Sequence, residues 1–138
     1  MEIDVPRKLS AKRYPIKYDE TKFLGDVNYP DGMVLSVGSS IKKRWKIQNV
    51  GKVPWENRFL QRMGATRGTG FIETPLLTPI PDTNPGQTVI IEIPMRMPSY
   101  AATVHAAFKM VDTAGFLCFP DRKGLFVSFN IEDPTPYS

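Results

Sequence analysis

Apolar and polar residues alternate along much of the chain, in short runs that turn residues separate. The run IKKRWKI at residues 41–47 is the clearest example. Successive side chains of a β-strand point to opposite faces of a sheet, so every second residue shares a face. We therefore predict a strand whose buried face holds Ile41, Trp45 and Ile47. Lys43 falls on the same parity, and we expect it near the exposed start of the strand.

Similar runs recur downstream, and seven or so short strands are predicted. They include residues 33–37, 57–63, 87–97, 103–111 and 124–133. A turn at residues 112–115 is expected to make a hairpin with a return strand, and the Gly- and Pro-rich residues 64–86 a long loop with short edge pieces. The core rows of the last two strands are predicted to be Val104, Ala106, Phe108 and Met110, and Leu125, Val127, Phe129 and Ile131.

The strand spacing predicts an all-β fold of the β-sandwich type. Turn signals recur about every 8 to 12 residues, as they do in immunoglobulin-like sandwiches, and no segment shows helical periodicity. The 13 prolines and 10 glycines fall between the apolar runs. A composition of 41% hydrophobic and 23% charged residues is that of a globular protein and not of a disordered one.

The 138 residues are expected to form one domain preceded by an arm. Residues 1–24 contain two prolines and mixed charges without a sustained period, so we predict an extended N-terminal arm. The sandwich is then predicted over residues 25–138. The arm is either a flexible tail or is ordered by lying on a neighbouring subunit.

Basic residues are concentrated in one part of the chain. The net charge is +4, and residues 41–72 hold eight basic residues against one acid, Glu56. The candidate partner surface is a basic stripe of Lys42, Arg44 and Lys46 with Arg58 and Arg62 from the next strand. Such a stripe can attract an acidic protein or phosphates, or it can simply keep an exposed strand soluble. No aromatic residue shares its parity, which disfavours single-stranded nucleic acid.

Catalytic chemistry finds little support in the sequence. His105 and Cys118 are the only residues of their kind, and no activating group accompanies them. One histidine and one cysteine do not make a zinc site, so we expect no enzyme activity, metal or cofactor, and a partly buried thiol at Cys118. The lone cysteine and the lack of an apolar run of about 20 residues predict a cytoplasmic protein without membrane contact.

Three blocks of the sequence resemble a known family. They are DVNYPDGMVLSVGSSIKKRWKIQNVGKVPW at 26–55, PDTNPGQTVIIEIPMRMP at 81–98 and FKMVDTAGFLCFPDRKGLFVSFNI at 108–131. Together they are similar to the Ig-like four-tryptophan (FW) domain of the neighbour-of-BRCA-one autophagy receptors, and most to its bacterial, actinobacterial relatives. The resemblance spans roughly residues 25–133. It implies an Ig-like β-sandwich and a non-catalytic protein-interaction module.

The resemblance also assigns the aromatic positions. Trp45 and Trp55 correspond to the first two signature tryptophans, and Phe108 and Phe126 replace the third and fourth. Phenylalanine keeps a large apolar ring but loses the indole N–H, so packing roles survive the exchange. Trp45 and Phe108 are expected to pack together in the core. Trp55 is expected either in the core or at a contact surface, and Phe126 points outward because it opposes the core row.

These observations predict a non-catalytic interaction or assembly module. A protein partner, acidic or a copy of the same chain, is expected to dock on an exposed sheet face or edge, with the basic stripe orienting it and Trp55 and Phe126 adding contact area. The arm is expected to contribute. One alternative is a structural subunit of a virion or other particle, such as a decoration protein. The other is a nucleic-acid-associated bacterial regulator, although no helix-turn-helix is visible.

Overall fold

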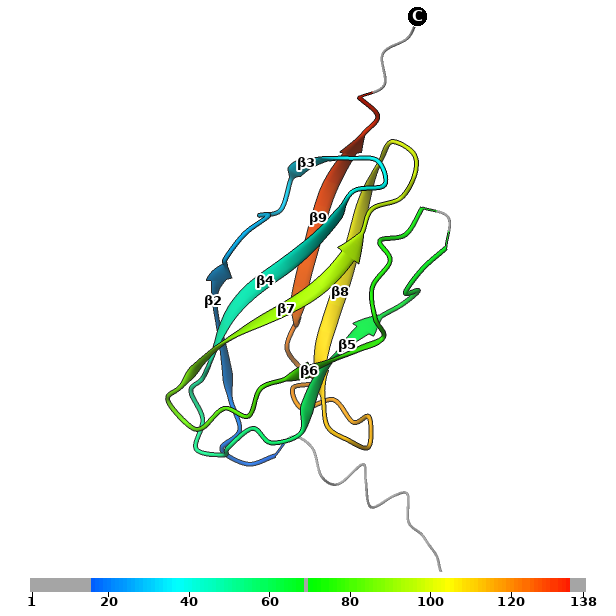
Figure 1. The fold of residues 1–138 in the computed structure, drawn as a ribbon. Coiled ribbons are helices and arrows are strands. Elements are labelled where there is room, and N and C mark those ends of the chain that lie inside the picture. The colour runs from blue at the N-terminus through cyan, green and yellow to red at the C-terminus, as the bar shows by residue number, and fades with distance from the viewer. Residues whose placement is uncertain (1–15, 69, 135–138) are drawn as a thin grey trace, which may run out of the picture.

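Two β-sheets packed face to face form the domain, as a computed structural model shows for residues 16–68 and 70–134 (Figure 1). The first sheet has the order β2-β4-β7 and the second the order β3-β9-β8-β5-β6. The strands are β2 (Thr21–Asp26), β3 (Met33–Ser36), β4 (Ser40–Asn49), β5 (Arg58–Met63), β6 (Leu77–Ile80), β7 (Thr88–Arg96), β8 (Ala102–Val111) and β9 (Leu125–Glu132). The described residues contain no helix, and the predicted all-β sandwich is confirmed.

The chain changes sheets between β2 and β3. Strand β2 pairs antiparallel with β4, whereas β3 pairs parallel with β9 in the other sheet. All other neighbours are antiparallel, with Trp45 opposite Ile91 in the first sheet and Phe108 opposite Leu125 in the second. Because β3 covers only Phe129–Glu132 of β9, the first half of β9 pairs with no strand on that side.

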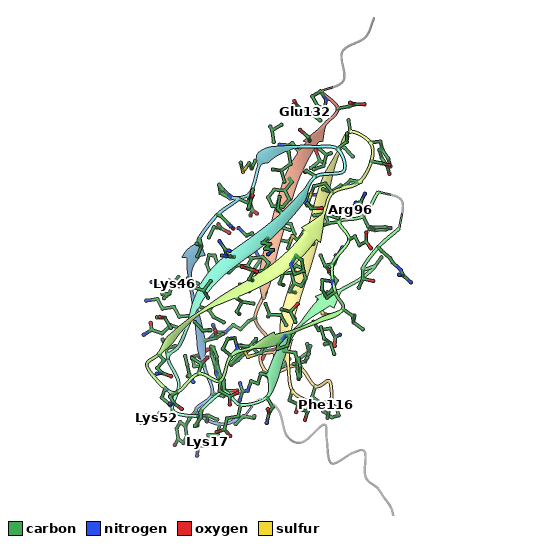
Figure 2. All side chains as sticks on the ribbon, in the orientation of Figure 1. Lys17, Lys46, Lys52, Arg96, Phe116 and Glu132 are labelled. Atoms are coloured by element: carbon green, nitrogen blue, oxygen red, sulfur yellow. The ribbon has the colours of Figure 1, made fainter. Side chains whose placement is uncertain are left out.

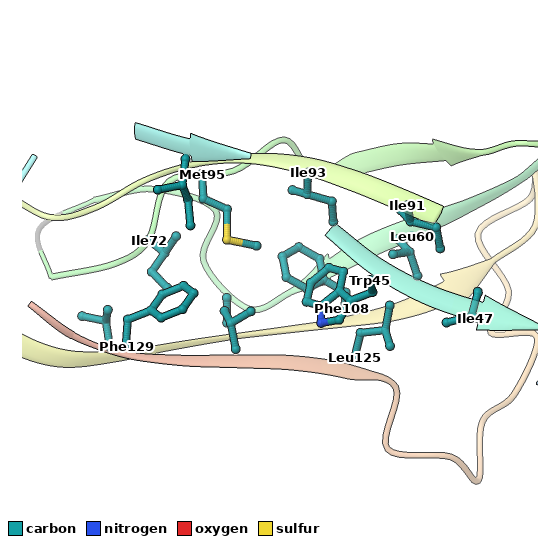
Figure 3. Close-up of a cluster of buried hydrophobic side chains, with 14 of the residues drawn as sticks. Trp45, Ile47, Leu60, Ile72, Ile91, Ile93, Met95, Phe108, Leu125 and Phe129 are labelled. Carbon is teal, nitrogen blue, oxygen red and sulfur yellow. The ribbon is translucent and has the colours of Figure 1, made fainter. Parts of the chain in front are cut away.

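The core lies between the sheets and follows the predicted parities. Trp45 of β4 contacts Phe108 of β8 edge to face, with ring centroids 5.5 Å apart, as the sequence predicts (Figure 3). Aromatic pairs of this geometry stabilise a fold by about 0.5 to 1.5 kcal/mol beyond their area burial. The predicted core rows of β8 and β9 are buried throughout. These contacts fix how the two sheets pack against each other.

Lys43 is buried, and the expectation that it lies at an exposed strand start is wrong. Its side chain is 0% exposed, and its ammonium group binds Asp26 Oδ1 at 2.6 Å. A register shift between Phe23 and Gly25 places Asp26 opposite Trp45, on the inward side of the strand. A β-bulge reorients the residues that follow it, which brings the carboxylate to the lysine.

The structure also changes two expected boundaries. Strand β2 begins at Thr21, so the sandwich starts before the predicted boundary at residue 25, and residues 1–15 of the predicted arm lie outside the described residues. After the turn at residues 112–115 only an isolated bridge joins Val111 to Leu117, and β9 is the strand that pairs with β8. The chain therefore has no full return strand at this turn.

Candidate functional site: a cationic sheet face

The outer face of the three-stranded sheet is cationic. Strand β4 exposes Lys42, Arg44 and Lys46 on this face, as the alternation predicts. Two further exposed cations join them, Lys22 of β2 and Arg96 at the end of β7. Figure 2 shows Lys46 and Arg96 along this sheet. Glu92 is the only acid that the three strands turn to this face, and its Oε1 accepts a hydrogen bond from Arg44 Nε at 2.7 Å.

The cations on this face lie beside apolar side chains and line part of a hollow. In the β4–β7 register Lys46 lies opposite Ile90, whose side chain is half exposed, and Lys42 lies opposite Pro94. A hollow of about 820 Å³ lies at this end of the sheet, with Lys42, Arg44 and Arg96 in its lining. Positive charge and apolar surface therefore lie side by side on the face.

Arg58 and Arg62 do not belong to the exposed stripe, and their expected placement on it is wrong. Arg58 is 6% exposed and its Nη1 lies 2.8 Å from Asp19 Oδ2. Arg62 is 3% exposed and donates hydrogen bonds to Ile72 O at 2.7 Å and to Thr74 Oγ1 at 3.0 Å. Both arginines point between the sheets because they share the parity of the core residue Leu60.

Trp55 is a core residue and does not offer contact area to a partner. It is 1% exposed, its ring packs against Phe119 with centroids 6.4 Å apart, and its Nε1 donates to Asp19 Oδ1 at 3.2 Å. Trp55 was expected either in the core or at a contact surface, and it lies in the core. Burial raises the pKa of the Asp19 carboxyl, although the ion pair with Arg58 and the Trp55 hydrogen bond oppose the rise.

Phe126 points outward, as predicted, but from the other sheet. It is 47% exposed and stacks on His105 with ring centroids 5.6 Å apart. Both residues lie on the outer face of the five-stranded sheet, in β9 and β8. The cationic face and the exposed aromatic pair are therefore separate surfaces, and one flat partner surface does not contact both.

His105 and Cys118 do not form a catalytic pair. His105 is exposed on the outer face of β8, whereas Cys118 is fully buried in the hydrophobic core. Burial raises the pKa of the Cys118 thiol to about 11, which disfavours the nucleophilic thiolate. Within the described residues no group of three histidine, cysteine, aspartate or glutamate side chains is arranged to hold a metal ion. No helix in the described part of the chain has the length and apolarity to cross a membrane.

Sequence reasoning missed three residues of functional or structural weight. Arg96 and Lys22 extend the cationic face, and the period of two in their own strands is a signal that can find them. Asp19 binds both Arg58 and Trp55, yet it lies in the segment expected as an arm. No local pattern marks Asp19, because its partners are more than 35 residues away along the chain.

The strand order and the parallel pairing of β3 with β9 define the chain as an immunoglobulin-like domain. A family model for the Ig-like domain from next to BRCA1 gene matches residues 28–128, and the chain belongs to this family. Comparison with curated protein sequences gives no significant match.

Two solved structures are similar to this chain at low sequence identity. The native conformation of E. coli alpha-2-macroglobulin is 15% identical, with a TM-score of 0.51 over 86% of this chain. The domain corresponds to only 7% of that chain, so the likeness shows the fold alone. AvmM, which catalyses macrocyclization in alchivemycin A biosynthesis, is 13% identical over 88% of this chain and 92% of its own, with a TM-score of 0.40 that supports no argument.

Proposed function

We propose that this Ig-like domain is a non-catalytic protein-interaction module that docks an acidic protein surface on the cationic face of its three-stranded sheet. The observation that carries the proposal is the composition of this face, where cations outnumber acids. The exposed residues are the cations Lys22, Lys42, Arg44, Lys46 and Arg96, the acid Glu92, and a second acid, Glu73, whose backbone pairs with that of Arg96 at the edge of the sheet. Charge of one sign on a face speeds and orients the encounter with an oppositely charged partner.

The apolar groups on the face favour a protein over a nucleic acid. Ile90 and Leu24 are exposed among the cations and suit the mixed apolar and polar surface of a protein interface. None of the outward-facing residues of β4 and β7 is aromatic, so these two strands offer no platform on which bases stack. The contribution of residues 1–15 to docking stays a prediction, since they lie outside the described residues.

The test compares two polyanions of different chemistry. An oligoglutamate peptide and a short DNA duplex are titrated against the domain at low and at moderate salt, with two-dimensional NMR mapping the shifted amides. We expect saturable binding of the peptide, with shifts confined to β4, β7 and the end of β2. The double variant Lys42→Gln/Lys46→Gln should weaken peptide binding about tenfold, from two charge contacts of up to threefold each.

The matched control is Lys52→Gln/Arg67→Gln, which removes two exposed cations outside the face. Equal weakening by both double variants would mean that net charge and not the face binds the peptide. Tighter, steeply salt-dependent binding of the duplex would replace the proposal with the nucleic-acid alternative.

A further inference from the structure

A pocket opens between the two sheets on the side where β2 faces residues 119–125. Its volume is about 380 Å³, within the range of about 300 to 1,000 Å³ that is typical of ligand sites. Core residues form its floor: Ile47, Leu60, Phe108, Met110, Phe119 and Leu125, of which all but Phe119 are at most 8% exposed. Most of the lining is apolar, which is also typical of small-molecule sites.

The pocket is open because two strand edges leave it uncovered. Phe23 of β2 lies opposite Ile47 in the sheet register and lines the pocket, yet its side chain is half exposed. On the facing sheet, β3 covers only the second half of β9. A second hollow adjoins the first and shares four lining residues with it, Phe23, Lys123, Gly124 and Leu125. Trp45 and the acids Asp26 and Asp31 also line this second hollow. The two hollows therefore make one elongated depression at the solvent-open edge between the sheets.

The mouth of the pocket is cationic. Lys109, Arg122 and Lys123 line it together with one acid, Asp121. Arg122 is already paired with Glu20, and Lys109 Nζ donates to Pro120 O at 3.2 Å. Lys123 has no carboxylate partner among the described residues, and its exposed ammonium group is free to meet an anion.

We infer that this pocket binds a linear medium-chain carboxylate, with the alkyl chain between the sheets and the carboxylate at Lys123. An elongated apolar interior excludes charged or highly polar ligands, because polar groups without partners are costly to bury. A cationic mouth selects an anionic end over a neutral one. The site is separate from the proposed protein-docking face. That face is the outer side of the three-stranded sheet, whereas the pocket opens between the two sheets.

The domain carries its own reporters for this site. Trp45 contacts the pocket residue Phe108, and Trp55 contacts the pocket residue Phe119, with ring centroids 5.5 and 6.4 Å apart. These are the two tryptophans of the chain. A ligand whose alkyl chain enters the pocket should therefore change the intrinsic tryptophan fluorescence of the protein.

The experiment titrates the full chain with hexanoate, octanoate, decanoate and decanol, all below micelle-forming concentrations, and follows tryptophan fluorescence. We expect saturable binding whose dissociation constant falls about fourfold for each added methylene until the pocket is filled. Decanol should bind more weakly than decanoate. Absence of a saturable change with decanoate, or affinity independent of chain length, would overturn the inference.

Two single variants locate the two ends of the ligand, and a third is the control. Phe23→Asp places a carboxylate on the apolar wall at a half-exposed edge position and should weaken decanoate at least tenfold. Lys123→Gln should weaken decanoate about two- to fivefold and leave decanol unchanged. Arg67→Gln removes an exposed charge outside the pocket and should change neither.

Circular dichroism and thermal melting confirm that each variant is folded before its affinity is compared. Undiminished binding of decanoate to folded Phe23→Asp would place the ligand outside the pocket. Equal losses in Lys123→Gln and Arg67→Gln would show that the carboxylate responds only to net charge, and both results contradict the inference.

Discussion

Lys43 shows how a single buried charge fixes the crossover between the sheets. Its ammonium group donates to Asp26 Oδ1, Asn28 O and Tyr29 O, at 2.6, 2.6 and 2.9 Å. Asp26 is the last residue of β2, and Asn28 and Tyr29 lie in the segment that leads from β2 to β3. A lysine with three donors satisfied in this way is tolerated in a core, whereas its acceptors would be left without partners if it were removed.

Lys43→Ala should therefore destabilise the domain by about 3 kcal/mol, the lower end of the cost of breaking a buried ion pair, because Asp26 keeps some contact with water. Urea denaturation measures the change in the free energy of unfolding. Lys46→Ala, at the exposed position three residues on, is the matched control and should change stability by no more than about 0.5 kcal/mol. Equal effects of the two variants would contradict a structural role for Lys43.

Arg58 and Asp19 form a second buried pair, and this one depends on pH. Burial raises the pKa of Asp19 above its unfolded value, so the native state binds the proton more tightly than the unfolded state does. The contribution of this carboxyl to stability is therefore greatest below its unfolded pKa and falls as pH rises through its folded pKa. Arg58 limits that fall by stabilising the charged form.

Arg58→Leu should cost about 3 to 5 kcal/mol at pH 7, where it leaves a buried carboxylate without a counterion. The loss should be smaller at pH 4 than at pH 7, because the raised pKa lets a larger fraction of Asp19 fold in its protonated form as the pH falls. Urea denaturation at the two pH values measures the difference. In the double variant Asp19→Asn/Arg58→Leu the additional pH dependence should disappear, and its persistence would assign the effect to another group.

At the scale of single strands, the sequence predicts β4 well and β5 poorly. In β4 the residues Trp45 and Ile47 mark the inner face, which also holds two polar residues, Lys43 and, at the end of the strand, Asn49. In β5 two apolar residues, Phe59 and Met63, lie on one face and only one, Leu60, lies on the other. The pattern therefore predicts that Phe59 and Met63 face the core, but the structure buries the face with Leu60. Burial of Arg58 and Arg62 depends on partners from distant segments, which strand periodicity does not contain.

Gly51, just after β4, allows residues 18–20 to pack closely against the loop between β4 and β5. A Cβ atom at this position would lie 2.6 Å from Glu20 N and would also collide with Tyr18 O. Lys52 N donates to the same Tyr18 oxygen at 2.7 Å. Only glycine allows the two backbones to approach this closely, because it has no side chain.

Gly51→Ala should therefore displace residues 18–20 and weaken β2, with a loss of stability of about 1 to 3 kcal/mol, which is typical of steric overpacking. Hydrogen–deuterium exchange should accelerate in residues 19–23 before the rest of the sandwich. Val50→Ala, at the exposed neighbouring position, is the control and should leave that exchange unchanged. Unchanged exchange in Gly51→Ala would show that the backbone accommodates a methyl group here.

On the scale of the whole molecule, the basic stripe, Trp55 and Phe126 were predicted to share one partner surface, but the sandwich places them apart. Lys42, Arg44 and Lys46 are exposed as predicted, and the fold follows from the strand pattern and the family resemblance. Trp55 is buried, however, and Phe126 lies on the other sheet. A period of two assigns residues to the two faces of one strand, but it does not tell which strands share a sheet.

The extent of the domain gives a last prediction. Residues 1–24 were expected to be an arm, but Asp19 binds Arg58 and Trp55, and Thr21–Asp26 pairs with β4. Deletion of residues 1–24 should therefore lower the melting temperature strongly or prevent folding, because it removes the carboxylate that pairs with a buried arginine and most of an edge strand. Deletion of residues 1–15 leaves all these contacts in place and serves as the matched control. If both truncated chains melt at the same temperature, residues 16–24 do not belong to the folding unit, and the boundary at residue 25 is restored.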